Sequence, residues 1–453
     1  MGKLFGTDGI RGIVGGELTS ALARLVGRAL VGVLNDGGCE APRVLIGMDT
    51  RLSSDMLADS VMEGISEAGG DTAIIGVCST PAVAYLLLKH KYDAGVMISA
   101  SHNPWTYNGI KIFGADGFKL NDGLEEEIER RIESDEDFTR AEKAGSLVYT
   151  PEMVEEYIEY LLSATDVSLK GMRIGIDCAN GSASESAEKL FTRLGAECHM
   201  LADHPDGVNI NESCGSTHME KLRRLVLEKG LDAGVAFDGD ADRCLAVDGC
   251  GNYIDGDHIL AILSTSLKAE GKLNNNAVVG TVMSNLGLIK YCERCGIEFL
   301  STKVGDRYVL EKLNEGGLSL GGEQSGHIIL RELSTTGDGQ LTAVRLLTEV
   351  KKSGKSLSAL AGVMKKFPQY MINVRADAQD KEAFRTDAVI KELTTSCEAE
   401  IKGNGRILIR PSGTEHLIRV MTEGEDPVVA EEICRRLADS IEKRLAELKE
   451  AVG

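Results

Sequence analysis

Four short polar segments carry the residues best suited to chemistry. In the first, residues 99–104 read Ser-Ala-Ser-His-Asn-Pro, which places Ser101 beside His102 in a turn just past an apolar run. A hydroxyl in such a place is exposed, near backbone amides and close to an imidazole, which suits a nucleophile or a phosphorylated serine. An ordinary polar turn is the alternative when this segment is read alone.

The second segment has a carboxylate at every other position. Its acidic residues are Asp238, Asp240 and Asp242. Carboxylates so close repel one another when all are ionised, so the segment either binds a cation or retains protons. Oxygen ligands favour a hard cation, and we predict one Mg²⁺ per chain, with a solvated acidic turn as the alternative. A calcium EF-hand is excluded, because its sixth position is Arg243 and its twelfth is Gly249.

The third and fourth segments offer groups that bind sugars and phosphates. Residues 322–327 (Gly-Glu-Gln-Ser-Gly-His) combine a carboxylate, a hydroxyl and an imidazole, which suits sugar hydroxyls or an amino substituent; a polar hairpin is the alternative. Residues 410–415 (Arg-Pro-Ser-Gly-Thr-Glu) place a guanidinium beside hydroxyls and glycine amides, which suits a phosphate. A nucleotide P-loop is excluded, because Glu349 stands where the first glycine of that motif belongs.

Short apolar runs that alternate with helical periodicity must position these segments. This rhythm predicts α/β architecture with mainly parallel sheets covered by helices. The predicted strands are 43–48, 94–98, 173–178, 233–237, 277–283 and 297–302, and the predicted helices are 53–68, 219–229 and 337–352. The last part of the chain predicts a small α+β module, with strands 370–374, 406–409 and 417–421 and helices 381–393 and 427–449.

A short sequence repeat links the first three polar segments. The tetrapeptide Asp-Ala-Gly-Val occurs at 93–96 and again at 232–235, each time running into a polar segment, and the apolar residues 317–321 run into the third. Ligands of open α/β sheets bind beyond the carboxyl ends of strands. Three repeated units could therefore aim their loops at one shared cleft, although chance similarity between buried strands is the alternative.

Composition limits the class of protein. The 453 residues contain 70 acidic and 50 basic side chains, for a net charge of −20, which argues against unspecific binding to nucleic acid or anionic lipid. The most apolar stretch, 22–34, contains two arginines, so we expect no membrane span, and the N-terminal residues do not form a secretory signal. Eleven scattered cysteines suggest buried thiols in a cytoplasmic protein. The pair at 292 and 295 fits a helix end better than half a zinc site.

In this order and spacing, the four segments resemble the α-D-phosphohexomutase family across essentially the whole chain. Residues 5–12, 47–51, 80–81 and 304–308 also match motifs of that family. Gln324, with residues 205–211 and 214–218, is similar to the bacterial branch that acts on glucosamine phosphates, whereas the glucose and mannose branches usually carry Met or another residue there. Two positions depart from the family pattern: His416 replaces a usual Pro, and Ser54 replaces a frequent Gly.

The resemblance implies a fold of three related mixed α/β domains and a smaller α+β C-terminal domain around a central cleft. We place these domains at 1–156, 157–256, 257–367 and 368–453. The first would carry the phosphoserine, the second the metal, the third the sugar site and the fourth the phosphate site.

The same resemblance implies a role for each candidate site residue. Ser101 would carry a phosphoryl group and, through a phosphoserine oxygen, bind Mg²⁺ together with Asp238, Asp240 and Asp242. The other catalytic residues would be Lys111 as general acid or base, with His102, Arg11 and Arg243 steadying the phosphate. The substrate-binding residues would be Lys303, Glu323, Ser325, His327, Arg410, Ser412, Gly413 and Thr414.

The implied reaction is the reversible interconversion of glucosamine 6-phosphate and glucosamine 1-phosphate through a 1,6-bisphosphate, supplying UDP-N-acetylglucosamine and cell-wall precursors. A hexose or hexosamine 1,6-bisphosphate activator, an activating kinase and a homodimer through the first domain are further expectations. Glucose or mannose phosphate are alternative substrates. A Mg²⁺-dependent phosphatase using Asp238 and Asp240, or a non-catalytic sugar-phosphate sensor, are alternatives from other classes.

Overall fold

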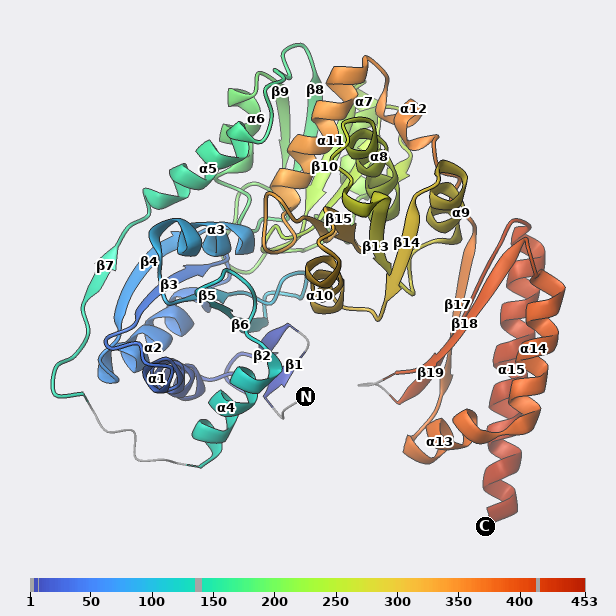
Figure 1. Cartoon of the computed structure of the whole chain (residues 1–453), viewed down its shortest axis with the longest axis horizontal. Coiled ribbons are helices and arrows are strands. Elements are labelled where there is room, and N and C mark those ends of the chain that lie inside the picture. The colour runs from blue at the N-terminus through green and yellow to red at the C-terminus, as the bar shows by residue number, and fades with distance from the viewer. Residues whose placement is uncertain (1–3, 7, 135–140, 413–415, 453) are drawn as a thin grey trace. The chain divides into compact units, whose positions relative to one another are not determined.

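The computed structural model describes residues 4–6, 8–134, 141–412 and 416–452. The chain forms two compact units, each with its own core (Figure 1). The first unit contains residues 1–284 and 295–363, and the second contains residues 285–294 and 364–453. The chain therefore passes between the units three times, at 284/285, 294/295 and 363/364.

The first unit begins with a seven-stranded sheet of order β1-β2-β6-β5-β3-β4-β7. Its strands are β1 (Phe5–Gly6), β2 (Gly9–Ile13), β3 (Arg43–Met48), β4 (Asp71–Val77), β5 (Ala94–Ile98), β6 (Tyr107–Gly114) and β7 (Leu147–Tyr149). Its helices are α1 (Ser20–Asp36), α2 (Ser54–Glu67), α3 (Thr80–His90) and α4 (Asp122–Glu133). Buried Val44, Ile46 and Val96 from the strands pack with Leu30 and Val61 from α1 and α2, which fixes this sheet beneath its helices.

Two further sheets complete the first unit. A five-stranded sheet has the order β12-β11-β10-β8-β9, and a four-stranded sheet has the order β14-β13-β15-β16. The strands of the former are β8 (Arg173–Asp177), β9 (Glu197–Leu201), β10 (Ala233–Phe237), β11 (Cys244–Asp248) and β12 (Tyr253–Ile254), with helices α5 (Met153–Ser163), α6 (Ala187–Arg193) and α7 (Glu220–Lys229). The latter contains β13 (Ala277–Thr281), β14 (Glu298–Thr302), β15 (Leu320–Gly322) and β16 (Ile328–Leu330), with helices α8 (Gly256–Ala269), α10 (Asp306–Gly316), α11 (Gly339–Ser353) and α12 (Leu357–Ala361).

The three sheets are mixed, which corrects the expectation of mainly parallel sheets. The antiparallel pairing recurs at the same place in each sheet. In each sheet a parallel strand is followed directly by an antiparallel neighbour: β5 by β6, β10 by β11, and β15 by β16. Only antiparallel strands can be joined by so short a connection, because a parallel pair needs a crossover of a dozen or more residues. These three connections are the first three polar segments, so the repeat suggested by the sequence is present at corresponding places in the three sheets.

The second unit has a three-stranded antiparallel sheet of order β17-β19-β18. Its strands are β17 (Gln369–Arg375), β18 (Gly405–Pro411) and β19 (Leu417–Gly424), and its helices are α9 (Leu286–Cys295), α13 (Ala378–Thr386), α14 (Ala388–Ile401) and α15 (Pro427–Val452). Helices α14 and α15 pack on the sheet (Figure 1). The single helix expected at 381–393 is two helices, because Asp387 ends α13 and its carboxylate accepts a hydrogen bond from the Ile390 amide to cap α14.

The expectation for the cysteine pair is met. Cys292 and Cys295 lie in the last turns of α9, as a helix end with two thiols. Among the helices that the structure describes, none is long and apolar enough to cross a membrane.

Candidate active site

The aspartate loop, residues 238–243 between β10 and β11, gathers three carboxylates at one point. One oxygen from each of Asp238, Asp240 and Asp242 lies within 4.8 Å of the others, and all three residues are buried. Small residues between them let the backbone curl, since Ala241 adopts a positive φ of 55°. This is the grouping that the alternating sequence predicted.

The serine loop, residues 99–106 between β5 and β6, brings Ser101 to the aspartate loop. The Ser101 hydroxyl donates a hydrogen bond to Oδ2 of Asp238 at 2.6 Å, and its Oγ lies 3.3 Å from Nδ1 of His102. Ser101 is 1% exposed and has a positive φ of 52°, which is uncommon for a residue with a side chain. Two loops that are far apart in the sequence thus meet where the buried Ser101 hydroxyl contacts Asp238.

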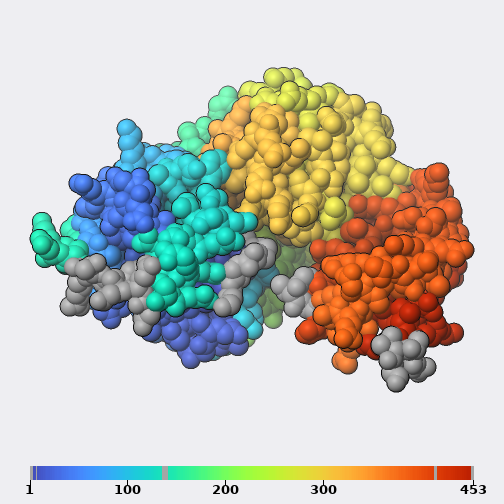
Figure 2. Space-filling model, turned by 60° about the horizontal axis from the view of Figure 1, so that its bottom comes forward, coloured from blue at the N-terminus to red at the C-terminus, as the bar shows by residue number. Residues whose placement is uncertain are grey.

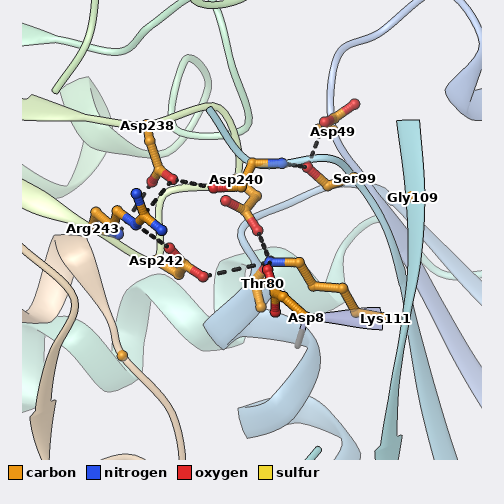
Figure 3. A network of polar contacts seen from close by, with 12 residues as sticks. Asp8, Asp49, Thr80, Ser99, Gly109, Lys111, Asp238, Asp240, Asp242 and Arg243 are labelled. Atoms are coloured by element: carbon orange, nitrogen blue, oxygen red, sulfur yellow. Dashed lines mark hydrogen bonds and ion pairs between the residues drawn. The ribbon is translucent and has the colours of Figure 1, made fainter. Parts of the chain in front are cut away.

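Lys111 extends from β6 into the same group of carboxylates. Its ammonium lies 2.7 Å from Oδ2 of Asp240, 3.1 Å from Oδ2 of Asp8 and 3.5 Å from Oδ2 of Asp242 (Figure 3). Burial alone would lower the pKa of Lys111, but these carboxylates outweigh burial and raise its pKa well above the usual range. Lys111 is therefore an ammonium in this arrangement and can give a proton but not take one.

The aspartate loop has the properties of a site for a divalent cation. Burial, together with repulsion from Asp242 and Asp240, raises the pKa of Asp238 to about 8. Oδ1 of Asp240 and Oδ1 of Asp242 are buried without a hydrogen-bond partner in the part of the chain that the structure describes. Oδ2 of Asp240 is already engaged, because it accepts hydrogen bonds from Lys111 and from the Thr80 hydroxyl. A hard cation bound by the remaining oxygens would relieve both the repulsion and the unmet hydrogen bonding, so the donor set fits Mg²⁺.

Arg243 and His102 close the site around Ser101. The Arg243 Nε lies 3.9 Å from Oδ2 of Asp238 and 3.8 Å from Oδ1 of Asp242, and its Nη1 lies 3.3 Å from Nδ1 of His102. Burial, with the adjacent Arg243 charge, lowers the pKa of His102 to about 4. The imidazole is therefore neutral near pH 7, and Arg243 supplies the positive charge beside Ser101.

The third polar segment turns between β15 and β16 and contributes polar groups without partners. Oγ of Ser325 and Nε2 of Gln324 are buried and form no hydrogen bond with any described residue. The Glu323 carboxylate accepts a hydrogen bond from the Gly305 amide at 2.9 Å. Uncommitted buried donors and acceptors are costly unless a ligand satisfies them, which is typical of a binding site.

His327 joins this segment to the aspartate loop. Its Nδ1 lies 3.6 Å from Oδ1 of Asp242 and its Nε2 lies 3.7 Å from Oδ2 of Asp306. Burial alone would lower the pKa of His327, but the two carboxylates outweigh burial and raise it.

Four residues of this network were not assigned from the sequence. They are Asp8, Thr80, Lys119 and Asp306. Asp8 bridges Lys111 and Lys119, and Lys119 in turn contacts Asp306. Asp8, Thr80 and Asp306 lie in the motifs at 5–12, 80–81 and 304–308. Their residue types did not indicate which side chain each would contact. Lys119 carried no sequence signal.

A cavity of about 840 Å³ opens beside this network. It lies between residues 114–124 and α10, and its wall includes Lys119, Asp306 and His327. The Arg307 guanidinium of α10 donates a hydrogen bond to Glu125 of α4 at 2.9 Å. On the face of the molecule seen in Figure 2, teal residues lie against gold residues of the same unit. The cavity gives space for a small molecule next to His327.

Two other predicted residues, Lys303 and Arg11, differ in their relation to this network. Lys303 is exposed, and its ammonium lies 5.6 Å from the Tyr308 ring. Arg11 on β2 is half-buried and donates a hydrogen bond to Asp8, so it reaches the network through that carboxylate.

The predicted phosphate segment belongs to the second unit. Arg410 lies at the end of β18 and the Ser412 amide donates to the Leu417 carbonyl at 2.8 Å, whereas Gly413 and Thr414 lie outside the described residues. Arg410 pairs across the strands with Arg419, which the sequence analysis had not assigned. Burial, and then the Arg419 charge, lowers the pKa of Arg410.

Family models for phosphoglucomutase/phosphomannomutase match four consecutive parts of the chain. The α/β/α domains I, II and III match residues 2–139, 155–251 and 255–367, and the C-terminal domain matches residues 371–440. The chain therefore belongs to the phosphohexomutase family, with three α/β/α domains and a C-terminal domain. The resemblance of the four polar segments is confirmed.

Individual proteins of the family are similar to almost the whole chain. The chain is 50% identical over 448 residues to phosphoglucosamine mutase of Acetivibrio thermocellus and 49% identical over 447 residues to that of Clostridium acetobutylicum, covering 98% of this chain and all of each relative. Among solved structures, a phosphoglucomutase/phosphomannomutase family protein from Burkholderia thailandensis is similar with a TM-score of 0.82 at 24% identity, covering 97% of each chain. Aspergillus fumigatus N-acetylphosphoglucosamine mutase, in complex with GlcNAc-6P and magnesium, has a TM-score of 0.67 at 16% identity, with 97% of this chain and 95% of that one covered. At these identities the structures support the fold alone.

Proposed function

We propose that this enzyme is a phosphoglucosamine mutase, an isomerase that interconverts glucosamine 6-phosphate and glucosamine 1-phosphate. The observation that carries the proposal is the hydrogen bond between the Ser101 hydroxyl and Asp238, inside a buried group of three carboxylates. Full-length relatives with this activity, about half identical to the chain, support the choice of substrate within the family. Glucose and mannose phosphates are the alternative substrates.

In this proposal Ser101 carries a phosphoryl group that it lends to the substrate. The bond between Oγ of Ser101 and phosphorus breaks as the substrate hydroxyl forms the new oxygen–phosphorus bond. The proton that the substrate hydroxyl loses is balanced by the proton that Oγ of Ser101 gains as it becomes a hydroxyl again. The product is a sugar 1,6-bisphosphate, which turns end for end and returns its other phosphate to Ser101. The transition state of phosphoryl transfer is loose, so the protein contributes mainly alignment and charge neutralisation.

Each residue of the network has a task in this scheme. Asp238, Asp240 and Asp242, with a phosphoserine oxygen, would hold Mg²⁺, which when bound neutralises charge on the phosphoryl oxygens. Arg243 steadies the phosphoryl group from the side of His102, consistent with the 3.3 Å between those side chains. Lys111 is the candidate general acid. Its carboxylate neighbours keep it an ammonium, and their charge must be offset before it gives its proton to an oxygen that gains charge, because a raised pKa makes a weaker acid.

The sugar and its second phosphate would meet the remaining predicted residues. Glu323, Ser325 and His327 bind the sugar, and the buried Ser325 hydroxyl is available for this because no described residue bonds to it. Arg410 and Ser412, with Gly413 and Thr414, bind the phosphate that is not reacting. Arg410 and Arg419 lie opposite each other on β18 and β19, which brings two guanidinium-bearing residues to this segment.

Several further expectations remain proposals drawn from the sequence and the family resemblance. They are the domain boundaries after residues 156, 256 and 367, a homodimer through the first domain, and a cytoplasmic location. Initial phosphorylation of Ser101 by a kinase or by a hexose 1,6-bisphosphate is another. Supply of UDP-N-acetylglucosamine and cell-wall precursors is the role that the substrate implies.

Substitution of the proposed nucleophile tests the function directly. Ser101→Ala should abolish mutase turnover and prevent the protein from gaining the mass of a phosphoryl group on incubation with glucose 1,6-bisphosphate. The exposed Ser134→Ala is the control and should retain both properties. Undiminished turnover in Ser101→Ala would end the proposal, and steady release of inorganic phosphate without Ser101 would favour a phosphatase. A comparison of kcat/KM on the glucosamine, glucose and mannose 1-phosphates decides the substrate.

A further inference from the structure

A completely buried guanidinium lies beneath the serine loop. The Arg51 side chain is not exposed to solvent, and its Nε pairs with Oδ2 of Asp49 at 2.8 Å. Its other nitrogens donate to carbonyl oxygens of the loop and of Tyr107, the first residue of β6. Nη1 donates to Pro104 at 2.5 Å and Tyr107 at 3.0 Å, and Nη2 donates to Ser101 and Asn103 at 2.9 Å each. A guanidinium has five N–H donors, so every one of them is used.

Asn211 reaches two of these carbonyl oxygens from a different part of the chain. Its side-chain amide donates to the Ser101 carbonyl at 2.9 Å and to the Asn103 carbonyl at 3.0 Å. Asn211 lies in the segment between β9 and α7, where its own amide bonds to the Ala179 carbonyl at 2.9 Å and its φ is 59°. Asparagine tolerates this left-handed backbone better than most residues.

The Ser101 carbonyl is enclosed on a third side by the aspartate loop. A Cβ atom on Gly239 would lie 2.5 Å from the Ser101 oxygen and 3.0 Å from the Asn211 side-chain nitrogen. Gly239 stands between Asp238 and Asp240, so the carbonyl of Ser101 packs against the backbone that carries the metal-binding candidates. The hydroxyl of the same residue bonds to Asp238 instead.

These contacts hold Ser101 in a backbone conformation that needs support. A serine at φ 52° lies in a sparsely populated region, and such residues persist only where their surroundings hold them. Carbonyl oxygens are also negatively polarised, and the phosphoryl group proposed for Ser101 carries close to two negative charges. Bonding the loop carbonyls to Arg51 and Asn211 fixes their positions while the charge on Ser101 changes.

We propose that Arg51 and Asn211 are positioning residues that hold the carbonyls of the serine loop and thereby keep Oγ of Ser101 in line for phosphoryl transfer. This inference rests on the proposed function, since it concerns the phosphorylated serine. Neither residue touches the reacting atoms. A small displacement of an attacking or leaving oxygen costs a large part of the rate, so the loss of either residue acts on the chemical step and not on substrate binding.

Asn211→Asp is the sharpest test, because it has nearly the same shape, tolerates the left-handed backbone, and turns both donors into acceptors that repel the carbonyls. Asn211→Gly keeps the backbone conformation and only removes the two bonds. The control is Asn209→Asp, which makes the same change two residues away. Among the residues that the structure describes, the Asn209 side chain bonds within its own segment, to His204 and Asp206. Arg51→Lys is a second probe, since three donors cannot replace five.

The measurements are the rate of Ser101 phosphorylation by glucose 1,6-bisphosphate, followed by intact mass, and kcat and KM for glucosamine 1-phosphate. We expect Asn211→Asp to lower the phosphorylation rate and kcat together by about 10- to 100-fold, with Asn211→Gly intermediate and KM nearly unchanged. The melting temperature, recorded for each variant, shows whether the loss occurs in folded protein.

Equal phosphorylation rates and kcat in the native protein and Asn211→Asp would overturn the inference, as would a loss confined to KM or to stability. An Arg51→Lys protein that does not fold leaves the decision with the Asn211 variants. Failure of the native protein to gain a phosphoryl group would instead overturn the proposed function, so the two failures are distinguishable.

Discussion

Oγ of Ser101 and Oδ2 of Asp238 lie 2.6 Å apart, although 137 residues separate them in the sequence. The pair joins the end of β5 in one sheet to the end of β10 in another. Asp238 accepts this hydrogen bond, and burial with two neighbouring carboxylates raises the pKa of Asp238 to about 8. The proposed nucleophile and the proposed metal site are therefore coupled through one hydrogen bond.

This coupling predicts proton release on metal binding. Near pH 7 Asp238 is mostly protonated, and Mg²⁺ requires the carboxylate, so binding should expel about one proton from the site. The apparent Mg²⁺ affinity should rise with pH by up to about tenfold per unit below pH 8 and level off above it. Titration calorimetry in buffers of different ionisation heat measures both quantities. A Mg²⁺ affinity that does not change between pH 6 and 8 would contradict the prediction.

We expect Thr80 to strengthen Mg²⁺ binding without contacting the ion. Its hydroxyl donates to Oδ2 of Asp240 at 2.5 Å and so orients the other carboxylate oxygen. Thr80→Val removes this bond at nearly constant shape, and we expect the Mg²⁺ affinity to fall by about 10- to 100-fold. Thr72→Val is the matched control, because its buried hydroxyl has no hydrogen-bond partner among the residues described. Equal Mg²⁺ affinities in the two variants would refute the role of Thr80.

Ser325 should contribute to substrate binding and not to stability. Its buried hydroxyl forms no hydrogen bond within the described parts of the chain, so Ser325→Ala should leave the melting temperature unchanged or raise it. Loss of a bond to the sugar should raise KM up to about tenfold. Ser264→Ala should do the reverse, because the buried Ser264 hydroxyl donates to the Ala261 carbonyl within α8. A lower melting temperature with unchanged KM in Ser325→Ala would count against a sugar contact.

Asp177 should make the protein less stable as pH rises. Its Oδ1 accepts a hydrogen bond from the Ala179 amide, whereas its Oδ2 is buried without such a partner in the described residues, and burial raises its pKa to about 6. Because the folded pKa exceeds the unfolded one, the stabilising contribution is complete below about pH 4 and is lost as pH rises through 6. The stability of Asp177→Asn relative to the native protein should therefore increase by up to about 3 kcal/mol between pH 4 and 7.

Denaturant unfolding at both pH values measures this difference. Asp166→Asn is the control for loss of a carboxylate at an exposed position. If the native protein and Asp177→Asn respond alike to pH, the buried carboxyl is not the cause.

The sequence was a good guide to the strands that carry the chemistry. The predicted strands 43–48, 94–98 and 233–237 have the bounds of β3, β5 and β10, because buried strands read as continuous Val- and Ile-rich runs. The mixed character of the sheets was less evident, since it depends on the short loops that force β6 and β11 to run antiparallel. The helix break at Asp387 was missed, because a helix cap in a long polar stretch does not interrupt its periodicity.

The types of residue at the candidate site were predictable from the sequence, but the contacts between their side chains were not. Ser101 and the three aspartates stand at strand ends, where periodicity and loop chemistry indicate them. The protonation of Lys111 was not predictable, because it depends on Asp8 and Asp240, which only the fold brings to it. The same holds for Asn211, whose two bonds to the serine loop leave no trace in local sequence.

Helix α9 belongs to the same compact unit as the last ninety residues, from 364 to 453, although it precedes them by about seventy positions. Glu423 of β19 is wholly buried and accepts from the Asn285 side chain, the Leu286 amide and Arg406. A fragment cut out at residue 364 would retain Arg406 and leave the rest of that carboxylate unsatisfied. An exchange of residues 364–453 between relatives would therefore succeed only if helix α9 and Asn285 were exchanged with them.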